Sequence, residues 1–220
     1  QYRLTVAIPG AAATVSNSWD LWVYPSPSTQ APPASVTITR NPREAVAAAN
    51  AGGTVLLIPG AADIVDPAGT PRPVLGFSTI FWNTAWTEGQ PPTTLGILCN
   101  PKHPLLARFP TEFHSNFQWW PLIRRAPKPL LLDGQNPALR PVIQVIDDWF
   151  TNRRLGLVVE ARCGSGRLLV SAIDFLADSA ADPATAQFRD SVLAYMTSPA
   201  FAPRHELPPA DLRRMVRLEP

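Results

Sequence analysis

Apolar and polar residues alternate over the first eight residues of the chain. The apolar residues are Tyr2, Leu4, Val6 and Ile8, and Arg3, Thr5 and Ala7 lie between them. This period of two is typical of a strand with one buried face. A Pro-Gly turn follows, and the aromatic-rich stretch 19–24 predicts a second strand. Because two strands alone are marginally stable in water, we expect residues 1–24 to be the terminal strands of a β-sandwich-like domain. The other strands of that domain are then either missing here or supplied by the next domain.

Residues 25–35 form the clearest linker in the sequence. Four prolines stand there among small polar residues, a composition that makes a stiff, extended spacer. We therefore place a boundary at this linker, with an α/β domain over residues 36–197 on its far side.

The pattern changes from residue 36 onward. Residues 36–38 predict a short strand, and Asn41 can cap a helix that begins at Pro42 and stops at a Gly-Gly pair. The continuous apolar run 54–58 is typical of a strand that is buried on both faces. This β-α-β order predicts an α/β fold with a mostly parallel sheet flanked by helices.

The rest of the chain is less regular, because Pro- and Gly-rich loops separate its short apolar stretches. Short helices are indicated near 104–109 and 116–125, and strands at 130–132 and 142–146. Two further strands, 155–162 and 167–173, are joined by a hairpin turn at 163–166, and a final helix spans 182–196. Residues 198–220 are rich in Pro and Arg, and we expect this tail to wrap the surface or to fray.

Composition limits the possible functions. A formal net charge of +2 does not favour binding to nucleic acid, and no apolar run approaches the roughly 18 residues that a membrane helix needs. The 26 prolines imply long ordered loops. Cys99 and Cys163 are compatible with one disulfide bridge or with two buried thiols. The chain starts directly in a strand pattern, without Met or a signal-like segment, so we expect it to be a piece of a longer polypeptide.

Several long and unusual motifs carry a resemblance to a known family. They are the segments 17–25 (NSWDLWVYP), 81–86 (FWNTAW), 94–104 (TLGILCNPKHP), 109–120 (FPTEFHSNFQWW) and 144–153 (QVIDDWFTNR). Together they resemble the C-terminal region of bacterial glycoside hydrolase family 2 enzymes of the β-galactosidase-like type, over residues 16–197. The α/β portion also resembles the flavodoxin-like fold of class I glutamine amidotransferases, which recurs as a non-catalytic module in β-galactosidases.

The resemblance implies that the chain is an accessory module. In that family the catalytic carboxylates lie on an upstream (β/α)8 barrel, and such a barrel needs about 250 residues by itself. The resemblance thus implies a non-catalytic role in carbohydrate degradation, in the periplasm or outside the cell, for domain or subunit assembly. The implied partners are the upstream domains of the same polypeptide and glycans, with a homo-oligomer as a further option. No cofactor, metal, nucleic-acid or membrane partner is expected.

Cys99, Glu112 and His114 supply the residue types of an amidotransferase triad. An active enzyme of that type needs its cysteine at a glycine-flanked strand-to-helix elbow, with a His/Glu pair to activate it. Cys99 follows a strand-like run but lacks the flanking glycines, and Glu112 and His114 stand in the wrong order. We therefore expect structural roles for these residues, with a hydrolase of amidotransferase type as the third alternative.

Glu112, Asp147 and Asp148 are the candidates for a carboxylate pair of the glycosidase type. Glycoside hydrolysis needs two carboxyls about 5–10 Å apart, and nothing in the spacing brings these together. The two aspartates at the end of a strand are more typical of a turn cap or of a partner for Arg153. His103 and His114 lack any recognised spacing of metal ligands.

Carbohydrate binding is the second alternative, because sugar rings stack on aromatic side chains and their hydroxyls bind amides and imidazoles. The candidate residues are Trp82, Asn83, Trp86, His114, Asn116, Gln118, Trp119, Trp120 and Trp149. Several are expected in loops at the carboxyl ends of strands, where open α/β sheets bind ligands. The competing explanation is that these side chains pack the Pro-rich loops onto the sheet or onto a neighbouring domain.

Overall fold

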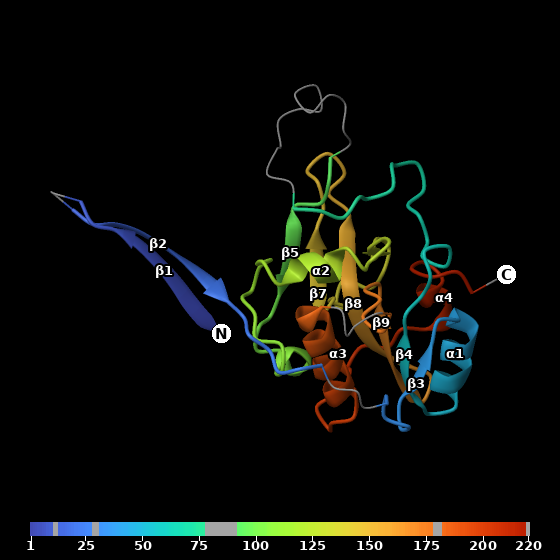
Figure 1. Cartoon of the computed structure of the whole chain (residues 1–220). Helices are drawn as coiled ribbons and strands as arrows, with labels where there is room; N and C mark the ends of the chain where they lie inside the picture. Colours follow the sequence, from blue (N-terminus) through green and yellow to red (C-terminus); the bar gives the residue numbers. More distant parts are fainter. Residues whose placement is uncertain (11–12, 28–30, 78–91, 178–181, 219–220) are drawn as a thin grey trace.

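The computed structural model describes residues 1–10, 13–27, 31–77, 92–177 and 182–218. The chain has two parts, a two-stranded ribbon at the N-terminus and a body that begins with the third strand (Figure 1). The elements in chain order are β1 (Tyr2–Ile8), β2 (Val15–Leu21), β3 (Thr37–Thr39), α1 (Pro42–Asn50), β4 (Thr54–Leu57), β5 (Gly96–Cys99), the 3-10 helix η1 (Pro104–Leu106), α2 (Trp119–Ile123), β6 (Leu130–Leu131), β7 (Ile143–Ile146), β8 (Arg154–Cys163), β9 (Gly166–Ser171), α3 (Pro183–Met196) and α4 (Pro209–Leu212).

The body is built on a seven-stranded mixed sheet. Its strand order is β3-β4-β9-β8-β7-β5, and β6 pairs with β8. Only the β3/β4 and β4/β9 pairs are parallel, whereas β8/β9, β7/β8, β5/β7 and β6/β8 are antiparallel. The prediction of a mostly parallel, helix-flanked sheet of the flavodoxin or amidotransferase type is therefore wrong, since just one end of the sheet is parallel and the described helices are few and short.

The β-α-β unit at that end forms as its sequence indicates. The Asn41 side chain accepts hydrogen bonds from the backbone N–H groups of Arg43 and Glu44, and Pro42 occupies the first turn of α1, where its missing N–H costs nothing. Residues 37–39 pair in parallel with 55–57. Helix α1 supplies the crossover that parallel pairing of two consecutive strands requires.

The predicted hairpin and the final helix are confirmed. Strands β8 and β9 pair antiparallel from Val158–Ser171 to Cys163–Gly166, and Gly164 adopts a left-handed φ of +57° at the turn. The Asp182 side chain caps α3 by accepting from the Thr185 N–H at 2.7 Å. The indicated helices 104–109 and 116–125 are each shortened, to η1 and α2. Cys99 and Cys163 are free thiols.

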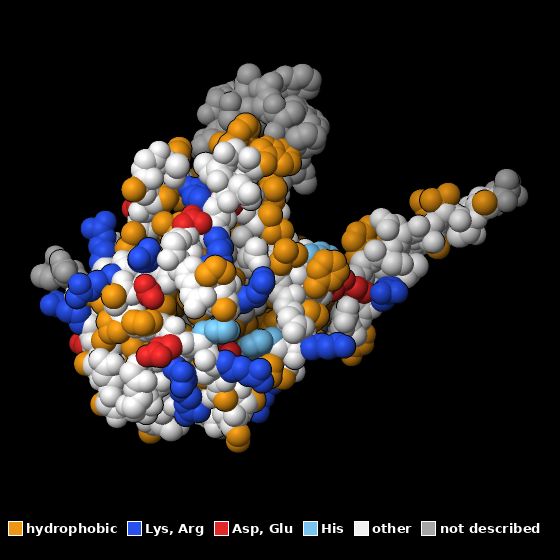
Figure 2. Space-filling view, turned by 180° about the vertical axis from the view of Figure 1, so that it is seen from behind, with side chains coloured by type: hydrophobic (Ala, Val, Ile, Leu, Met, Phe, Trp, Pro, Cys, Tyr) orange, Lys and Arg blue, Asp and Glu red, His pale blue; other side chains and the backbone are white. Residues whose placement is uncertain are grey.

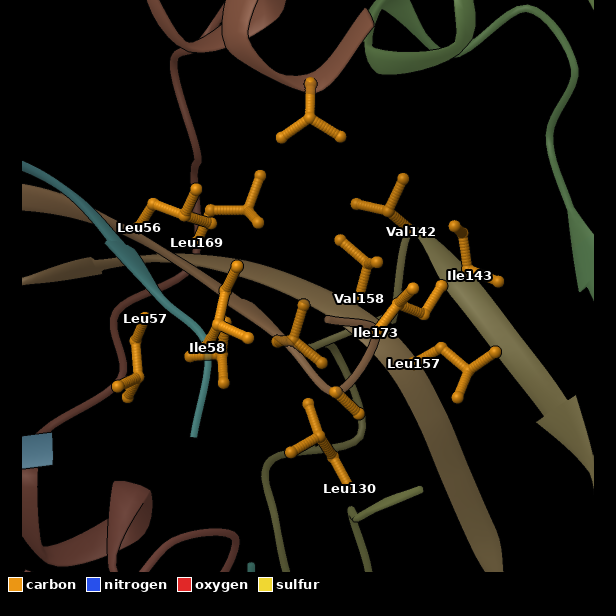
Figure 3. Packing of buried hydrophobic residues seen from close by; sticks show 14 of the residues in the cluster. Leu56, Leu57, Ile58, Leu130, Val142, Ile143, Leu157, Val158, Leu169 and Ile173 are labelled. Atoms are coloured by element: carbon orange, nitrogen blue, oxygen red, sulfur yellow. The ribbon is translucent and has the colours of Figure 1, made fainter. Parts of the chain in front are cut away.

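Apolar side chains from both parts of the sheet form one continuous core. The labelled members in Figure 3 come from β4, β6, β7, β8, β9 and their flanks, namely Leu56, Leu57, Ile58, Leu130, Val142, Ile143, Leu157, Val158, Leu169 and Ile173. Helices α2 and α3 lie side by side in front of the sheet in Figure 1. Beneath them Phe109, Trp119 and Phe188 meet edge to face, with ring centroids 5.2–6.0 Å apart.

The tail beyond α3 packs onto the body rather than fraying in its described part. The backbone N–H of Arg162 on β8 donates to the carbonyl oxygen of His205 at 2.7 Å, and the N–H of Leu207 donates back to Arg162 at 2.8 Å. Leu207, Leu212 and Val216 are buried. The body thus extends well past the predicted boundary at residue 197.

The ribbon β1–β2 projects away from the body (Figure 1). Its second strand spans 15–21, not the predicted 19–24, because the pairing with β1 ends where Tyr2 lies opposite Leu21. The chain then joins the body at Tyr24, whose ring stacks on Phe109 at 6.0 Å and whose hydroxyl donates to Gln118 Oε1. None of the described helices is long and apolar enough to cross a membrane.

Candidate functional site

A cavity of about 530 Å³ lies on the face of the body where β5, β7 and β8 approach the C-terminal tail. Its lining residues are Leu98, Cys99, Asn100, His103, Phe113, Ala138, Arg140, Pro141, Val142, Gln144, Glu160, Arg204 and His205. Segments far apart in the sequence therefore converge on it. Figure 2 shows histidine side chains close together on one face of the body, with Lys or Arg side chains around them.

His103 is held in a defined orientation in this cavity. It stands immediately before η1, and its Nδ1 accepts a hydrogen bond from the Leu105 N–H at 3.2 Å. Because Nδ1 is an acceptor, the neutral ring carries its proton on Nε2. That Nε2 lies 3.7 Å from Glu160 Oε1. The imidazole thus presents an N–H toward the carboxylate on β8.

Glu160 is also fixed from the opposite side by α3. The Tyr195 hydroxyl donates to Glu160 Oε2 at 2.6 Å, and the Tyr195 ring meets His103 edge to face at 5.5 Å. Burial, together with the neighbouring Glu160 carboxylate, raises the pKa of Tyr195 well above its usual value. Tyr195 therefore remains a hydrogen-bond donor throughout the physiological pH range, and it holds the carboxylate at the cavity wall.

Two arginines give the cavity an excess of positive charge. Arg140 precedes β7, and Arg204 lies in the tail segment that pairs with β8. Neither guanidinium has a carboxylate within ion-pair distance among the residues that the structure describes, and Glu160 is the one acidic residue of the described lining. Unpaired guanidinium groups are the preferred partners of carboxylate and phosphate oxygens.

The remaining lining combines apolar surface with uncharged polar groups. The Phe113 side chain is 62% exposed, and Leu98, Pro141 and Val142 add aliphatic surface. Asn100 and Gln144 contribute amides, each able to donate and accept. An aromatic face beside amides and cations suits a ligand with both C–H surface and oxygen substituents.

Cys99 lines the cavity but is not an activated nucleophile. Its thiol donates to the carbonyl oxygen of Glu112 at 3.3 Å. Burial raises the pKa of Cys99 to about 11, so the thiolate that a nucleophile requires is scarce at neutral pH. Cys99 ends β5, and Asn100 and Pro101 continue into a turn instead of the helix of a nucleophile elbow.

The structure brings Glu112 and His114 near Cys99 without forming a triad. Segment 112–114 runs beside β5, with the Cys99 N–H donating to the Phe113 carbonyl at 2.9 Å and His114 paired with Leu98. His114 Nε2 lies 3.8 Å from Glu112 Oε2. No hydrogen bond joins the Cys99 thiol to the His114 imidazole. His114 pairs with Leu98, and the side chains of Leu98 and Cys99 point to opposite faces because the two residues are consecutive in a strand.

Asp147 and Asp148 are fully engaged in a loop that follows β7. Asp147 accepts from Arg153 Nε at 2.7 Å, from the Arg153 backbone N–H at 2.8 Å and from Thr151 Oγ1 at 2.8 Å. Burial acts to raise the pKa of Asp147, but the hydrogen bonds from Arg153 and Thr151 outweigh it and hold that pKa below its usual value. Asp148 accepts from the backbone N–H groups of Phe150 and Thr151. Both carboxylates stabilise the loop, and neither lines the cavity.

The predicted sugar-binding residues are dispersed. Trp82, Asn83 and Trp86 lie outside the described residues. Trp119 is completely buried, with its indole N–H donating to Thr111 Oγ1 at 2.8 Å, so it offers no ring face to a ligand. Gln118 is buried as the partner of Tyr24 and of the Pro110 carbonyl.

The other predicted sugar-binding residues also lie outside the cavity lining. Asn116 donates to Thr111 and Glu112. Trp120 packs on Phe77 with ring centroids 5.8 Å apart, and about half of its surface remains exposed, as it does for Trp149.

Most of the residues that line the cavity could not be recognised from the sequence. Glu160 and Gln144 lie in predicted strands. Arg140 lies in a segment expected to be loop, and Arg204 and His205 lie in the tail, which was expected to wrap the surface or to fray. One available signal was Pro104, since proline is favoured at the first position of a helix and so marks His103 as the residue just before a helix start. Among the described residues, no group of three or more His, Cys, Asp or Glu side chains is placed to hold a metal ion.

Comparison with known families places the chain in one of them. A family model described as "Domain of unknown function (DUF8487)" matches residues 36–217, so the chain belongs to this family. The match begins beside β3 and ends in the packed tail, so it covers the whole body and leaves out the ribbon and the linker. No curated protein matches the chain.

Proposed function

We propose that the body is a non-catalytic module that binds carboxylated sugars in the cavity between β5, β7, β8 and the tail. The observation that carries the proposal is the pair of unpartnered guanidinium groups, Arg140 and Arg204, beside the exposed ring of Phe113. The arginines suit the carboxylate of a sugar acid, and the ring and aliphatic wall suit the C–H face of its pyranose. A volume of about 530 Å³ is within the range of small-ligand sites.

The chemistry of the lining supports a binding role over a catalytic one. Glycoside hydrolysis needs two carboxyls about 5–10 Å apart, and Glu160 is the one carboxylate of the described lining. The Cys99 thiol stays protonated near neutral pH. His103 and Glu160 are held by backbone and tyrosine contacts that suit hydrogen bonding to ligand hydroxyls.

The wider role that we propose is that of an accessory module in carbohydrate degradation. The resemblance to the C-terminal regions of family 2 glycoside hydrolases supports this setting, in the periplasm or outside the cell. In such an enzyme the module would hold an acidic glycan near a catalytic domain, at a site that performs no chemistry itself.

Isothermal titration calorimetry tests the proposal. D-galacturonate and D-glucuronate are expected to bind at least tenfold more tightly than D-galactose, which lacks the carboxylate. Arg140→Gln and Arg204→Gln should each weaken binding of the acids by about tenfold to a hundredfold, since a hydrogen bond to a charged group contributes about 1.5–3 kcal/mol.

Arg43→Gln is the matched control, because Arg43 is an exposed arginine on α1 outside the cavity. This variant should bind like the unmodified chain. Equal affinities for galactose and the two acids, or no heat at tens of millimolar of any of them, would refute the proposed function.

A further inference from the structure

The ribbon β1–β2 has one face made almost entirely of large apolar side chains. In its antiparallel register the directly paired residues share a face. The pairs on this face are Tyr2–Leu21, Leu4–Trp19, Val6–Asn17 and Ile8–Val15. The seven apolar side chains are 41–71% exposed. Figure 1 shows why, since the ribbon extends away from the body.

The opposite face of the ribbon is polar and internally satisfied. Arg3 Nε donates to Asp20 Oδ1 at 3.2 Å, and Thr5 and Ser18 share a hydrogen bond of 2.9 Å between their hydroxyls. This division into one apolar and one polar face is typical of an antiparallel sheet with one side packed and the other in water. The polar face is therefore suited to solvent, and the apolar face is suited to burial.

Both outer edges of the ribbon are open to further strands. The sheet that contains β1 and β2 has only these two strands among the described residues. Neither strand carries the Pro or Lys residues that protect many edges from pairing. A partner can thus extend the hydrogen-bonded ladder as well as cover the apolar face.

The size of the apolar face argues against a second copy of the chain as its partner. Each strand has seven residues, which makes the ribbon roughly 24 Å long and 10 Å wide, or about 240 Å² in flat area. Two ribbons face to face would cover about 500 Å², and a stable interface between free proteins needs roughly 1,000 Å² or more. A wider sheet that also pairs with the edges buries more of the ribbon than a second ribbon does.

We infer that the ribbon docks into an all-β domain, where it contributes two strands to one layer of a β-sandwich. The apolar face packs on the facing sheet of that domain at the usual separation of about 10 Å, and the Arg3–Asp20 face stays in solvent. The ribbon is short-tethered to the body, since Tyr24 is fixed on Phe109 and Gln118 only three residues after β2 ends. Docking would therefore hold the body, with its cavity, close beside the all-β domain.

Site-specific photo-crosslinking tests this inference in the cells that make the protein. The photoreactive amino acid p-benzoylphenylalanine is placed at position 6 or 8 on the apolar face, or at position 5 on the polar face as the matched control. Positions 6 and 8 are expected to link, after irradiation, to an apolar-polar alternating strand of an all-β domain, identified by mass spectrometry of the joined peptides. Position 5 should give at least tenfold less product.

Three outcomes would overturn the inference. They are a crosslink from position 6 or 8 to residues 2–21 of a second copy, a crosslink to a helical segment of any protein, and the absence of a product above the position 5 level. Circular dichroism of each variant guards against misfolding. The body should be unchanged, because the ribbon contributes no side chain to its core.

Discussion

Replacing Arg153 with methionine is expected to destabilise the body strongly while leaving the shape of the loop intact. The Asp147 side chain is 0% exposed and the Arg153 side chain 7% exposed, so the ion pair between them is shielded from water. The guanidinium also lies 3.5 Å from Asp148 Oδ2 and donates to the Pro71 carbonyl. Arg153→Met keeps the length of the side chain and the backbone hydrogen bond to Asp147, but it removes the charge that balances two buried carboxylates.

The expected loss is about 3–5 kcal/mol at pH 7, which is the usual cost of removing one partner from a buried ion pair. For a domain of this size each kcal/mol lowers the melting temperature by about 2–4 °C, so the melting temperature should fall by roughly 6–20 °C. The remaining donors to Asp147, the Thr151 hydroxyl and the Arg153 N–H, keep the cost from being larger.

The pH dependence gives a second and more specific signature. In the unmodified chain the pKa of Asp147 is lower in the folded state than its unfolded value near 3.9. The Arg153 contacts therefore contribute their full stability above about pH 4, and this contribution disappears as the pH falls through the lower folded pKa. In Arg153→Met, burial is opposed by fewer hydrogen bonds and raises the Asp147 pKa, so acidification protonates the group and relieves the penalty. The stability difference between the two proteins should shrink from pH 7 to pH 3.

Urea unfolding followed by circular dichroism at pH 7, 5 and 3 measures the effect. A double-mutant cycle with Asp147→Asn isolates the pair, and the double variant should be less destabilised than the two single losses predict. A loss below about 1 kcal/mol at pH 7, or a loss that grows on acidification, would refute the reasoning.

Two further perturbations test the state of Cys99 and the β8–β9 turn. Alkylation of Cys99 by iodoacetamide should be slow at pH 8 and should still be rising at pH 10, because burial raises its pKa to about 11; a rate that levels off below pH 9 would contradict this. Gly164→Ala should cost about 1–3 kcal/mol more than Gly69→Ala in thermal unfolding, because a Cβ at Gly164 would lie 2.9 Å from the Asn50 Cα, whereas Gly69, also left-handed, has nothing within 4 Å. Equal losses would show that the contact with Asn50 is unimportant.

The locally determined parts of the fold could be predicted from the sequence. The Asn41 and Asp182 caps, the β-α-β unit and the glycine-containing turn at 163–166 each depend on residues a few positions apart. The direction of the remaining strands depends instead on residues that are far apart in the sequence. Short apolar runs such as 96–99 and 143–146 have the same pattern whether their neighbours are parallel or antiparallel, so this pattern does not specify the antiparallel pairings that the structure has.

The cavity was hidden from the sequence for a related reason. Arg140 and Arg204 stand in Pro-rich segments with no periodic pattern, and they become neighbours only because the tail pairs with β8. The tryptophans, by contrast, were candidates for sugar binding, yet Trp119 packs against Phe188 of α3 in the core. The residue types suggested a binding surface, whereas the cavity itself is formed by pairing between segments far apart in the sequence.

The pairing of the tail with β8 also couples two properties of the molecule. Two hydrogen bonds, from Arg162 to His205 and from Leu207 to Arg162, hold Arg204 and His205 against the sheet. Release of the tail would therefore dismantle one wall of the cavity while leaving the β8–β9 hairpin intact. Conversely, an anion bound between Arg140 and Arg204 would bind only the state in which the tail is paired with β8. Such an anion would therefore stabilise that paired state by mass action. Ligand binding in the cavity and pairing of the tail with β8 would then rise and fall together.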